Sequence, residues 1–446
     1  MCRLYLTVIL FFSLSFNLLA LPKIAVTGDF RGEIKPCGCS EEGDKGGIER
    51  QSTYFKQLDK KEKRRIWLDL GNFSGHSTPQ GILKTEMIAK LFQKKKLFAI
   101  LPGPMDFARG TLGFKEMVLP YVVSNLAQSL PNVKSVRNMR NEVAVFGYLS
   151  SETLSRGKHQ TKYLRTINDF VEILNSLIIN QPAKFKVLLF RGNEKELALL
   201  KKQGVFDLII PANDAKSEEF QKPEIQLAQE RFQVPPLKGQ GVLEFSVSTK
   251  AGKTSLSHQL VWLTSTYKDD PSWKKDFDDY QKKVEALFFL DLERQQAEGD
   301  KSLYKGAEYC LTCHSKIENK WKASKHAHAW KTLVDINRNF DPECVKCHTL
   351  GYQKGGFLTE ELTPKLINVQ CENCHGITPE HETWGGKYFG YIPYCKNCHG
   401  TEDPSRIDPG YKKNRKKVTE TLCKGCHMGS HSPSFKFDEY WPVIQH

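Results

Sequence analysis

CLTCH at residues 310–314 decides what the last third of this 446-residue chain can be, because four more copies of Cys-x-x-Cys-His follow it. The others are CVKCH at 344–348, CENCH at 371–375, CKNCH at 395–399 and CKGCH at 423–427. This spacing attaches a c-type haem, since two thiols add across the haem vinyl groups and the adjacent histidine binds the iron. Zinc sites use cysteine pairs two at a time, and five pairs leave one over. The sequence therefore predicts a region that handles electrons.

The motifs assign the residues that hold five covalent haem c groups. The predicted attachment cysteines are Cys310, Cys313, Cys344, Cys347, Cys371, Cys374, Cys395, Cys398, Cys423 and Cys426. The predicted proximal iron ligands are His314, His348, His375, His399 and His427.

The first twenty residues indicate export. Arg3 precedes an apolar run over residues 4–19, which Ala20 closes. The run is short for a membrane span and is typical of a signal peptide over residues 1–20, with an uncleaved anchor as the alternative. Because haem attaches to such motifs outside the cytoplasm, we expect a periplasmic or otherwise exported protein. We expect no integral membrane span in its mature form.

The chain is basic, with a formal net charge of +14 and a pI near 9.0. Each haem carries two propionates, so five haems add about −10 and leave the holoprotein at about +4. This small net charge gives no reason to expect a nucleic-acid partner, and we expect other redox proteins as partners. The basic runs at residues 60–65, 94–96 and 412–417 are either solvated faces and propionate partners or a docking patch for an acidic redox protein.

Hydrophobic patterning divides the mature chain into three segments. Residues 21–268 alternate short β-branched runs with amphipathic stretches, which predicts an α/β domain with a more antiparallel end. The expected strands are residues 23–27, 65–70, 98–101, 143–146, 186–190, 207–210, 242–247 and 258–263. Residues 269–302 form a charged linker with a helix over 280–296. Residues 303–446 have few apolar side chains, so we expect a mainly α domain with the haems as its core.

The α/β domain resembles the metallophosphoesterase domain of periplasmic 5′-nucleotidases in the order of its elements. IAVTGDFRGEIKPC (24–37) stands where that family has a strand ending in Asp-x-His-Gly, and WLDLGNFSG (67–75) where it has Asp-x-Gly-Asp. LPGPMDF (101–107) stands where it has Gly-Asn-His-Glu. The resemblance implies a layered α/β sandwich.

Most metal ligands of that family are replaced in this chain. Asp29 keeps the first aspartate. The other expected positions hold Arg31, Asn72, Pro104, Met105 and, near a further expected histidine, Arg191. One carboxylate among neutral groups cannot hold two divalent ions. We therefore expect a metal-free domain that is not a phosphatase.

Cys37 and Cys39, in PCGCS, are a candidate redox pair in this domain. A Cys-x-Cys ring is tight and strained, and strain makes a disulfide easier to reduce. A structural or merely tolerated pair is the alternative. The PCGC motif resembles motifs of other nucleotidase-like proteins, which favours redox use.

Residues 303–446 resemble the cytochrome c-554 type of multihaem cytochrome. YKGAEYCLTCHSKIENKWKASKHAHAW (304–330) matches the opening of that family, where a haem motif precedes Trp and Ser-x-His-Ala-x-Ala. The ending, CKGCH followed by HSPSFKFDEYW, matches its last segment. The motif at 395–399 lies in an insertion, which gives five motifs where the family typically has four.

Five histidines of this domain lie outside the motifs and are candidate distal iron ligands. They are His326, His328, His381, His431 and His446. On a helix His326 and His328 would point about 200° apart, so they could serve two haems. The resemblance favours His326, His381 and His446, whereas His431 lies on a turn. An iron without a distal ligand would be open to substrate.

Two functions follow from these patterns. In the favoured one, the protein carries electrons between periplasmic redox partners, and the catalytically dead phosphoesterase-like domain docks one of them. In the other, it is a haem oxidoreductase that acts on a small nitrogen or sulfur compound at an open haem or at Cys37 and Cys39.

Export with a cytochrome c maturation system should load five haems per chain, because each motif supplies two thiols and a histidine. Intact mass and the pyridine haemochrome assay should agree on five. A stable four-haem product with free Cys395 and Cys398 would contradict the assignment of the inserted motif.

Overall fold

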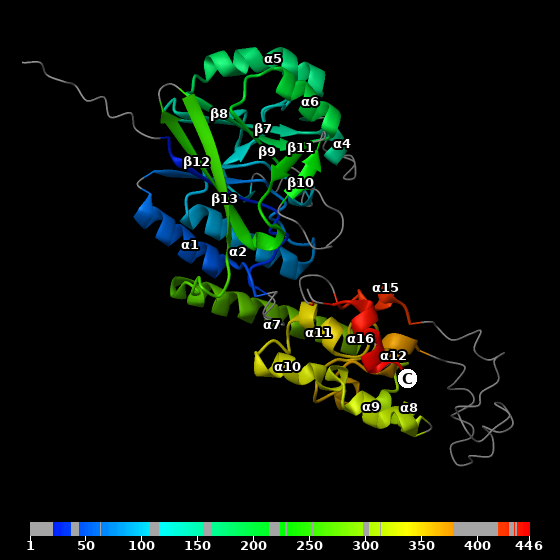
Figure 1. Ribbon diagram of the computed structural model, residues 1–446. Helices are drawn as coiled ribbons and strands as arrows, with labels where there is room; N and C mark the ends of the chain where they lie inside the picture. The colour runs from blue at the N-terminus through cyan, green and yellow to red at the C-terminus, as the bar shows by residue number, and fades with distance from the viewer. Residues whose placement is uncertain are drawn as a thin grey trace, which may run out of the picture.

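The computed structural model describes residues 21–36, 44–62, 64–107, 116–154, 163–213, 224–227, 230–250, 253–297, 303–312, 314–377, 418–427, 432 and 435–446. These ranges form an α/β part and a smaller helical part, with the long helix α7 (Lys274–Ala297) beside both (Figure 1). The predicted α/β and mainly α classes are confirmed. Among the described helices, none is both long enough and apolar enough to cross a membrane.

The larger sheet of the α/β part has the strand order β13-β12-β1-β2-β3-β4-β5. Strands β1 to β5 pair in parallel, and β12 pairs antiparallel with both β1 and β13. The bounds are β1 Lys23–Thr27, β2 Arg65–Asp69, β3 Ala99–Ile100, β4 Tyr121–Val122, β5 Val133–Lys134, β12 Gly241–Lys250 and β13 Lys253–Trp262. The antiparallel end expected from the sequence is confirmed.

The second sheet has the order β6-β7-β8-β9. Strands β7, β8 and β9 are parallel, and β6 is antiparallel to β7. The bounds are β6 Val136–Met139, β7 Val143–Leu149, β8 Phe185–Arg191 and β9 Leu208–Pro211. A separate hairpin pairs β10 (Glu224–Leu227) with β11 (Glu230–Gln233). The sequence did not predict β5, β6, β10 and β11, because short strands with several polar residues carry little hydrophobic pattern.

Side-chain alternation along the strands sets the layers of the α/β part. Ile24 and Val26 of β1 lie in one buried cluster with Val145 of β7. Ala25, between them, lies in a cluster with residues of α1 and α2. Phe146 of β7 lies in a third cluster with residues of α5 and α6. Because successive strand side chains point to opposite faces, the two sheets pack face to face between two layers of helices (Figure 1).

Local sequence signals mark where the covering helices begin. The helices are α1 (Ile48–Lys61), α2 (Pro79–Lys94), the short α4 (Ser151–Leu154), α5 (Ile167–Asn180) and α6 (Glu194–Lys202). Helix α2 starts after Thr78, whose hydroxyl accepts from the Gly81 amide at 3.1 Å. Pro79 takes the first helical position, where its missing N–H is not needed. Capping boxes start α5 and α6.

Helix α7 has side chains in two hydrophobic cores. Phe277, Tyr280 and Val284 belong to the cluster that α1 and α2 cover. About one turn further, Phe288 belongs to the buried cluster of the helical part, together with Trp330. The helix predicted over residues 280–296 is confirmed, and it starts six residues earlier than expected. It is therefore packed against both parts along its length.

The helical part has a small apolar core. Its helices are α8 (Ala307–Leu311), α9 (Glu318–Lys322), α10 (Ala329–Asp335), α11 (Pro342–His348), α12 (Cys371–His375), α15 (Glu420–Cys423) and α16 (Phe437–Ile444). The buried cluster of the described residues is Phe288, Trp330, Leu333, Val345, Leu350, Tyr352, Phe357 and Leu366. Eight side chains do not offset the chain entropy of such a domain. That haem supplies much of the core of this part stays a prediction.

Phe288→Ala should lower the free energy of unfolding of the holoprotein by about 3–5 kcal/mol, because it leaves a cavity where α7 enters the core of the helical part. Phe289→Ala is the matched control on the same helix, since Phe289 is 48% exposed and Phe288 only 4%. It should change the free energy by less than about 1 kcal/mol. Denaturant unfolding followed by far-ultraviolet circular dichroism measures both. Equal losses from the two variants would refute the role given to Phe288.

Candidate functional site

Short helical turns carry the haem motifs. Helix α11 ends with the whole second motif, and α12 is the third motif itself. The first and fifth motifs begin in α8 and α15. His314 N donates to Cys310 O at 3.0 Å, and His427 N donates to Cys423 O at 2.9 Å, which are i to i−4 hydrogen bonds of a helical turn. A helical turn places residues i and i+3 on one face, which suits two thiols that bind one haem.

Thiols of different motifs lie beside one another. Cys310 of the first motif is hydrogen-bonded to Cys371 of the third. Cys347 of the second is hydrogen-bonded to Cys426 of the fifth. These hydrogen bonds, together with burial, raise the pKa of Cys310 and of Cys347 above the ordinary thiol range. The first motif is therefore a neighbour of the third, and the second a neighbour of the fifth.

Two pairs of histidine rings lie close together, with their planes tilted by 52° and 63°. The ring centroids of His326 and His427 are 6.0 Å apart, and those of His375 and His446 are 5.6 Å apart. Two imidazoles bound on opposite sides of one metal ion, each with a bond of about 2 Å, hold their centroids about 6 Å apart. Each pair joins a motif histidine to a candidate distal histidine. The spacing of these residues fits an iron with two axial imidazoles.

Hydrogen bonds at Nδ1 orient several of these rings. His348 Nδ1 donates to the Ala329 carbonyl at 2.6 Å, and His446 Nδ1 donates to the Ile444 carbonyl at 3.0 Å. His427 Nδ1 lies 3.1 Å from the Ser432 hydroxyl. A histidine that ligates a metal commonly uses its second nitrogen in this way, which leaves Nε2 for the metal. The sequence could not identify these acceptors, because two of them are backbone carbonyls.

His326 and His328 lie in a 3₁₀ turn, Lys325–His328, rather than in an α-helix. The turn is tied to the third motif, because Val369 N donates to His326 O at 3.1 Å. Burial lowers the pKa of His326, which favours the neutral form that binds iron. His328 is exposed and donates from Nε2 to the Lys322 carbonyl at 2.9 Å. The two neighbours therefore have different environments.

The remaining predicted site residues lie outside the described part of the chain. They are Cys37, Cys39, Cys313, Cys395, Cys398, His399, His381 and His431. Among the residues that the structure does describe, the motif cysteines are free thiols. No group of three His, Cys, Asp or Glu side chains in the described ranges is arranged to hold a metal ion.

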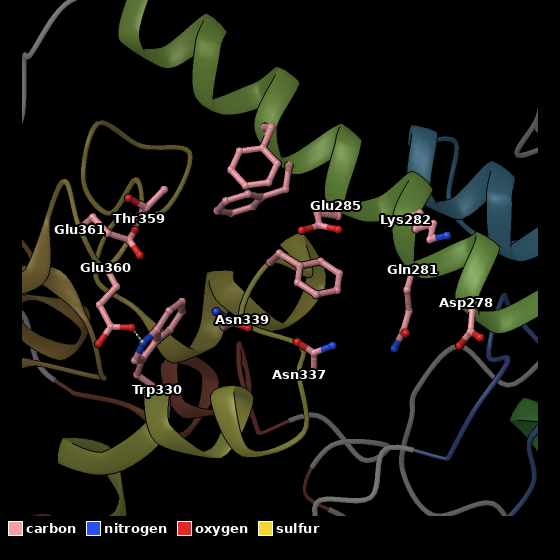
Figure 2. Close-up of a pocket in the computed structure, with 13 residues that line it drawn as sticks. Asp278, Gln281, Lys282, Glu285, Trp330, Asn337, Asn339, Thr359, Glu360 and Glu361 are labelled. Carbon is pink, nitrogen blue, oxygen red and sulfur yellow. Dashed lines mark hydrogen bonds between the residues drawn. The ribbon is translucent and has the colours of Figure 1, made fainter. Parts of the chain in front are cut away.

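A pocket of about 500 Å³ lies between α7 and the helical part (Figure 2). Its aromatic wall includes Phe288 and Trp330, and four carboxylates line it against one lysine, Lys282. Trp330 Nε1 donates to the Glu360 carboxylate at 2.8 Å, as Figure 2 shows. Trp330 directly follows Ala329, whose carbonyl orients His348. The pocket is thus lined mainly by acidic side chains and lies next to the residue whose carbonyl orients the histidine of the second motif.

The α/β part has its own buried polar cluster at the carboxyl ends of β1, β2 and β8. Asp29, Arg31 and Asn72 have φ values of 51°, 51° and 52°. Asp and Asn adopt the left-handed region more readily than other L-residues, whereas it is uncommon for arginine. The side-chain Nδ2 of Asn72 donates to Asp29 Oδ1 at 2.9 Å, and the backbone N–H of Asn72 donates to Asp106 Oδ2 at 2.7 Å. Sequence reasoning missed Asp106, because a lone aspartate in a 3₁₀ turn carries no pattern.

Arg191 is fully buried in this cluster. Burial lowers the pKa of Arg191, and the carboxyls of Asp29, Asp106 and Asp69 oppose that change. Burial likewise raises the pKa of Asp29, and Arg191 opposes this most strongly. A guanidinium beside three buried carboxyl groups supplies opposite charge inside the protein, which offsets part of the cost of burying each group.

Comparisons with known proteins bear mainly on the helical part. The sequence profile of the family described as cytochrome c554 and c-prime matches residues 309–376. Cytochrome c-554 of Nitrosomonas europaea is 34% identical over 172 residues, which cover 34% of this chain and 69% of that protein. The multiheme cytochrome MtrA of Shewanella baltica is 29% identical over 148 residues, which cover 30% of this chain and 41% of that protein.

Among solved structures, the chain is similar to a 5′-nucleotidase precursor from Thermus thermophilus. The identity is 15% and the TM-score 0.47, over 60% of this chain and 59% of the nucleotidase chain. The chain thus spans less than two thirds of that protein.

The stability of the α/β part should fall as the pH rises towards 7, partly because of Asp69. Burial raises the pKa of Asp69 to about 7, whereas an unfolded aspartate titrates near ~3.9. Between these values the folded state holds a proton that the unfolded state has lost. The contribution of Asp69 to the free energy of unfolding is therefore complete below about pH 4 and is lost as the pH rises through about 7.

Asp69→Asn should remove this contribution, which amounts to roughly 3–4 kcal/mol across that range at about 1.4 kcal/mol per pH unit. Denaturant unfolding from pH 4 to 8 measures the slope in both proteins. Parallel pH profiles for wild type and Asp69→Asn would contradict the buried titration.

Proposed function

The chain belongs to the cytochrome c-554 family, and we propose that it is an exported cytochrome that carries electrons between periplasmic redox partners through five covalent haems. The observation that carries this proposal is the pairing of His326 with His427 and of His375 with His446, at 6.0 Å and 5.6 Å between ring centroids. The two imidazoles of each pair would hold one haem iron, which supplies one-electron exchange when bound. Such a site exchanges electrons without admitting a substrate.

Haem, when bound, would supply one-electron exchange between a reduced donor and an oxidised acceptor. The chain has to attach, orient and separate the haems. The ten motif cysteines would form the thioether bonds, and the five motif histidines would be the proximal ligands. On the distal side, His326 and His446 would bind the irons of the fifth and third motifs respectively. His381, His328 and His431 are the other distal candidates.

The neighbouring thiols support a continuous path for electrons. Cys310 is hydrogen-bonded to Cys371, and Cys347 to Cys426. Cys374 of the third motif also lies near Cys423 of the fifth. These contacts would place the haems in the order first, third, fifth, second. Adjacent attachment sites keep neighbouring haems close, which suits electron transfer along a chain.

The α/β part would serve as a docking domain without phosphoesterase activity. Asn72 is hydrogen-bonded to Asp29, and Arg191 lies beside Asp29, Asp69 and Asp106. With a guanidinium there, two divalent cations would meet like charge and too few carboxylates. Its domain boundary would fall near residue 268, where the segment that contains α7 begins.

One contact favours the oxidoreductase alternative. His328 uses Nε2 to bind the Lys322 carbonyl at 2.9 Å, so this nitrogen is engaged in the protein. Five irons would then have four remaining distal candidates. An iron left open could bind a small nitrogen or sulfur compound.

His326→Ala and His446→Ala should each convert one low-spin haem to high spin, because each removes one of two axial imidazoles. Electron paramagnetic resonance of the oxidised holoprotein counts the high-spin centres. His258→Ala, at an exposed position of β13 in the α/β part, is the control and should add no high-spin signal. A wild-type high-spin centre that binds and turns over nitrite, hydroxylamine or a sulfur anion would overturn the carrier function. Unchanged spectra in His326→Ala and His446→Ala would overturn the ligand assignment.

A further inference from the structure

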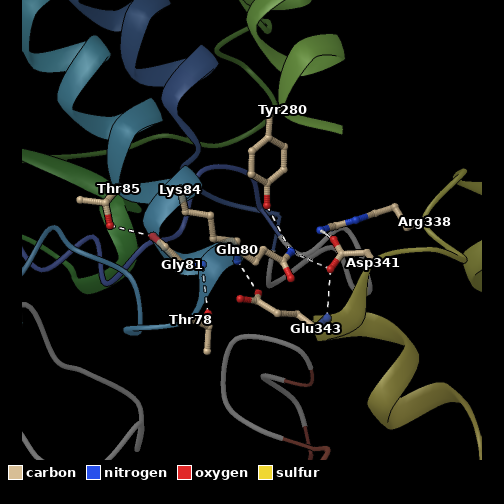
Figure 3. A network of polar contacts seen from close by, with 9 residues as sticks. All are labelled: Thr78, Gln80, Gly81, Lys84, Thr85, Tyr280, Arg338, Asp341 and Glu343. Atoms are coloured by element: carbon tan, nitrogen blue, oxygen red, sulfur yellow. Dashed lines mark hydrogen bonds and ion pairs between the residues drawn. The ribbon is translucent and has the colours of Figure 1, made fainter. Parts of the chain in front are cut away.

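We propose that Lys84 and Gln80 of the α/β part are positioning residues for the haem site at residues 344–348, where they hold α11 and set the charge beside its haem. Figure 3 shows the polar cluster that joins the start of α2 to the start of α11. The inference rests on the proposed function in one respect, that residues 344–348 attach a haem. It gives the α/β part a role in electron transfer beyond docking.

Gln80 is the central donor of the cluster. It is 5% exposed, and its Nε2 donates to Asp341 Oδ1 at 2.7 Å and to the Tyr280 hydroxyl at 3.2 Å. The three side chains come from α2, α7 and the residue that caps α11 (Figure 3). One buried amide thus fixes three elements that are far apart in the sequence.

Asp341 carries that contact directly to the haem motif. It is 3% exposed, and its Oδ1 accepts from the Glu343 amide at 3.0 Å as the N-cap of α11. Its Oδ2 accepts from Arg338 at 2.5 Å. Helix α11 has the sequence PECVKCH and so consists almost entirely of the second motif. The position of the attachment cysteines therefore depends on a cap that the α/β part holds in place.

Lys84 adds a charged contact to the same helix. Its ammonium group forms an ion pair with Glu343, the residue before Cys344. Although burial lowers the pKa of Lys84, Glu33 and Glu343 raise it above the ordinary lysine value. Lys84 is therefore charged at neutral pH. It connects α2 to the helix of the second motif.

The cluster places two cations and two anions at one end of α11. Lys84 pairs with Glu343, and Arg338 pairs with Asp341 while lying next to Cys344. A partly buried charge acts over a low local dielectric and is weakly screened. A positive charge favours the reduced haem, which holds one more electron, and a negative charge disfavours it. Lys84 should therefore raise the reduction potential of this haem, and Glu343 should lower it.

The test is a spectroelectrochemical titration of the full-length holoprotein at constant pH, with the one-electron components resolved. Lys84→Met should shift one component to lower potential, and Glu343→Gln should shift the same component to higher potential. The double variant should lie between the two. Lys84→Arg keeps the charge and should stay near wild type. Lys23→Met removes a comparable partly buried ion pair, with Glu244 at 2.9 Å, and should shift no component.

Gln80→Leu separates position from charge. It removes the hydrogen bond to Asp341 without changing any formal charge, so it should lower the unfolding temperature and broaden the spectrum of one haem. Unmoved potentials in both Lys84→Met and Glu343→Gln, or shifts of both in the same direction, would overturn the proposal while leaving the electron-carrier function intact. A wild-type protein without reversible reduction would instead overturn the proposed function.

Discussion

Helix α7 joins the α/β part to the helical part, because it has side chains buried in a hydrophobic cluster of each. Phe277 and Val284 pack under the helices of the α/β part, and Phe288 packs in the core of the helical part. A rigid helix of 24 residues that is anchored at both sites limits how far the two parts can move apart. The polar contacts of Gln80 and Lys84 can form only because this helix brings α2 and α11 together.

The helical part solves a different physical problem, since it has few apolar side chains and must hold large cofactors. Its described residues build the sites from short turns, caps and backbone acceptors. The Ala329 carbonyl orients His348, and the Ile444 carbonyl orients His446. Such contacts leave the second ring nitrogen available to iron. Haem attachment and folding should therefore depend on each other in this region.

The α/β part contains a buried polar cluster in which carboxyl, amide and guanidinium groups lie together. Asp29 and Asn72 keep unusual backbone conformations at the ends of adjacent strands. Arg191 comes from β8 of the other sheet and brings its charge into the same place. A buried ion cluster of this kind is retained only while its charges stay balanced, because a lone buried charge costs several kcal/mol. Arg191, whose guanidinium also donates to the Leu70 carbonyl after β2, therefore links the two sheets.

The sequence by itself determined the chemistry and most of the fold class. The Cys-x-x-Cys-His spacing needs no partner elsewhere in the chain, and the strong β-branched runs predicted eight strands, all present within a few residues. Short strands such as β5 and β10 were missed because their pairing, rather than their composition, makes them strands. Only the tertiary structure decided which histidine rings lie close together and that Asp106 and Arg191 share a buried site. It also decided that Asp341 both caps the helix of the second motif and accepts a hydrogen bond from Gln80. These facts depend on long-range packing, which brings together residues more than a hundred positions apart.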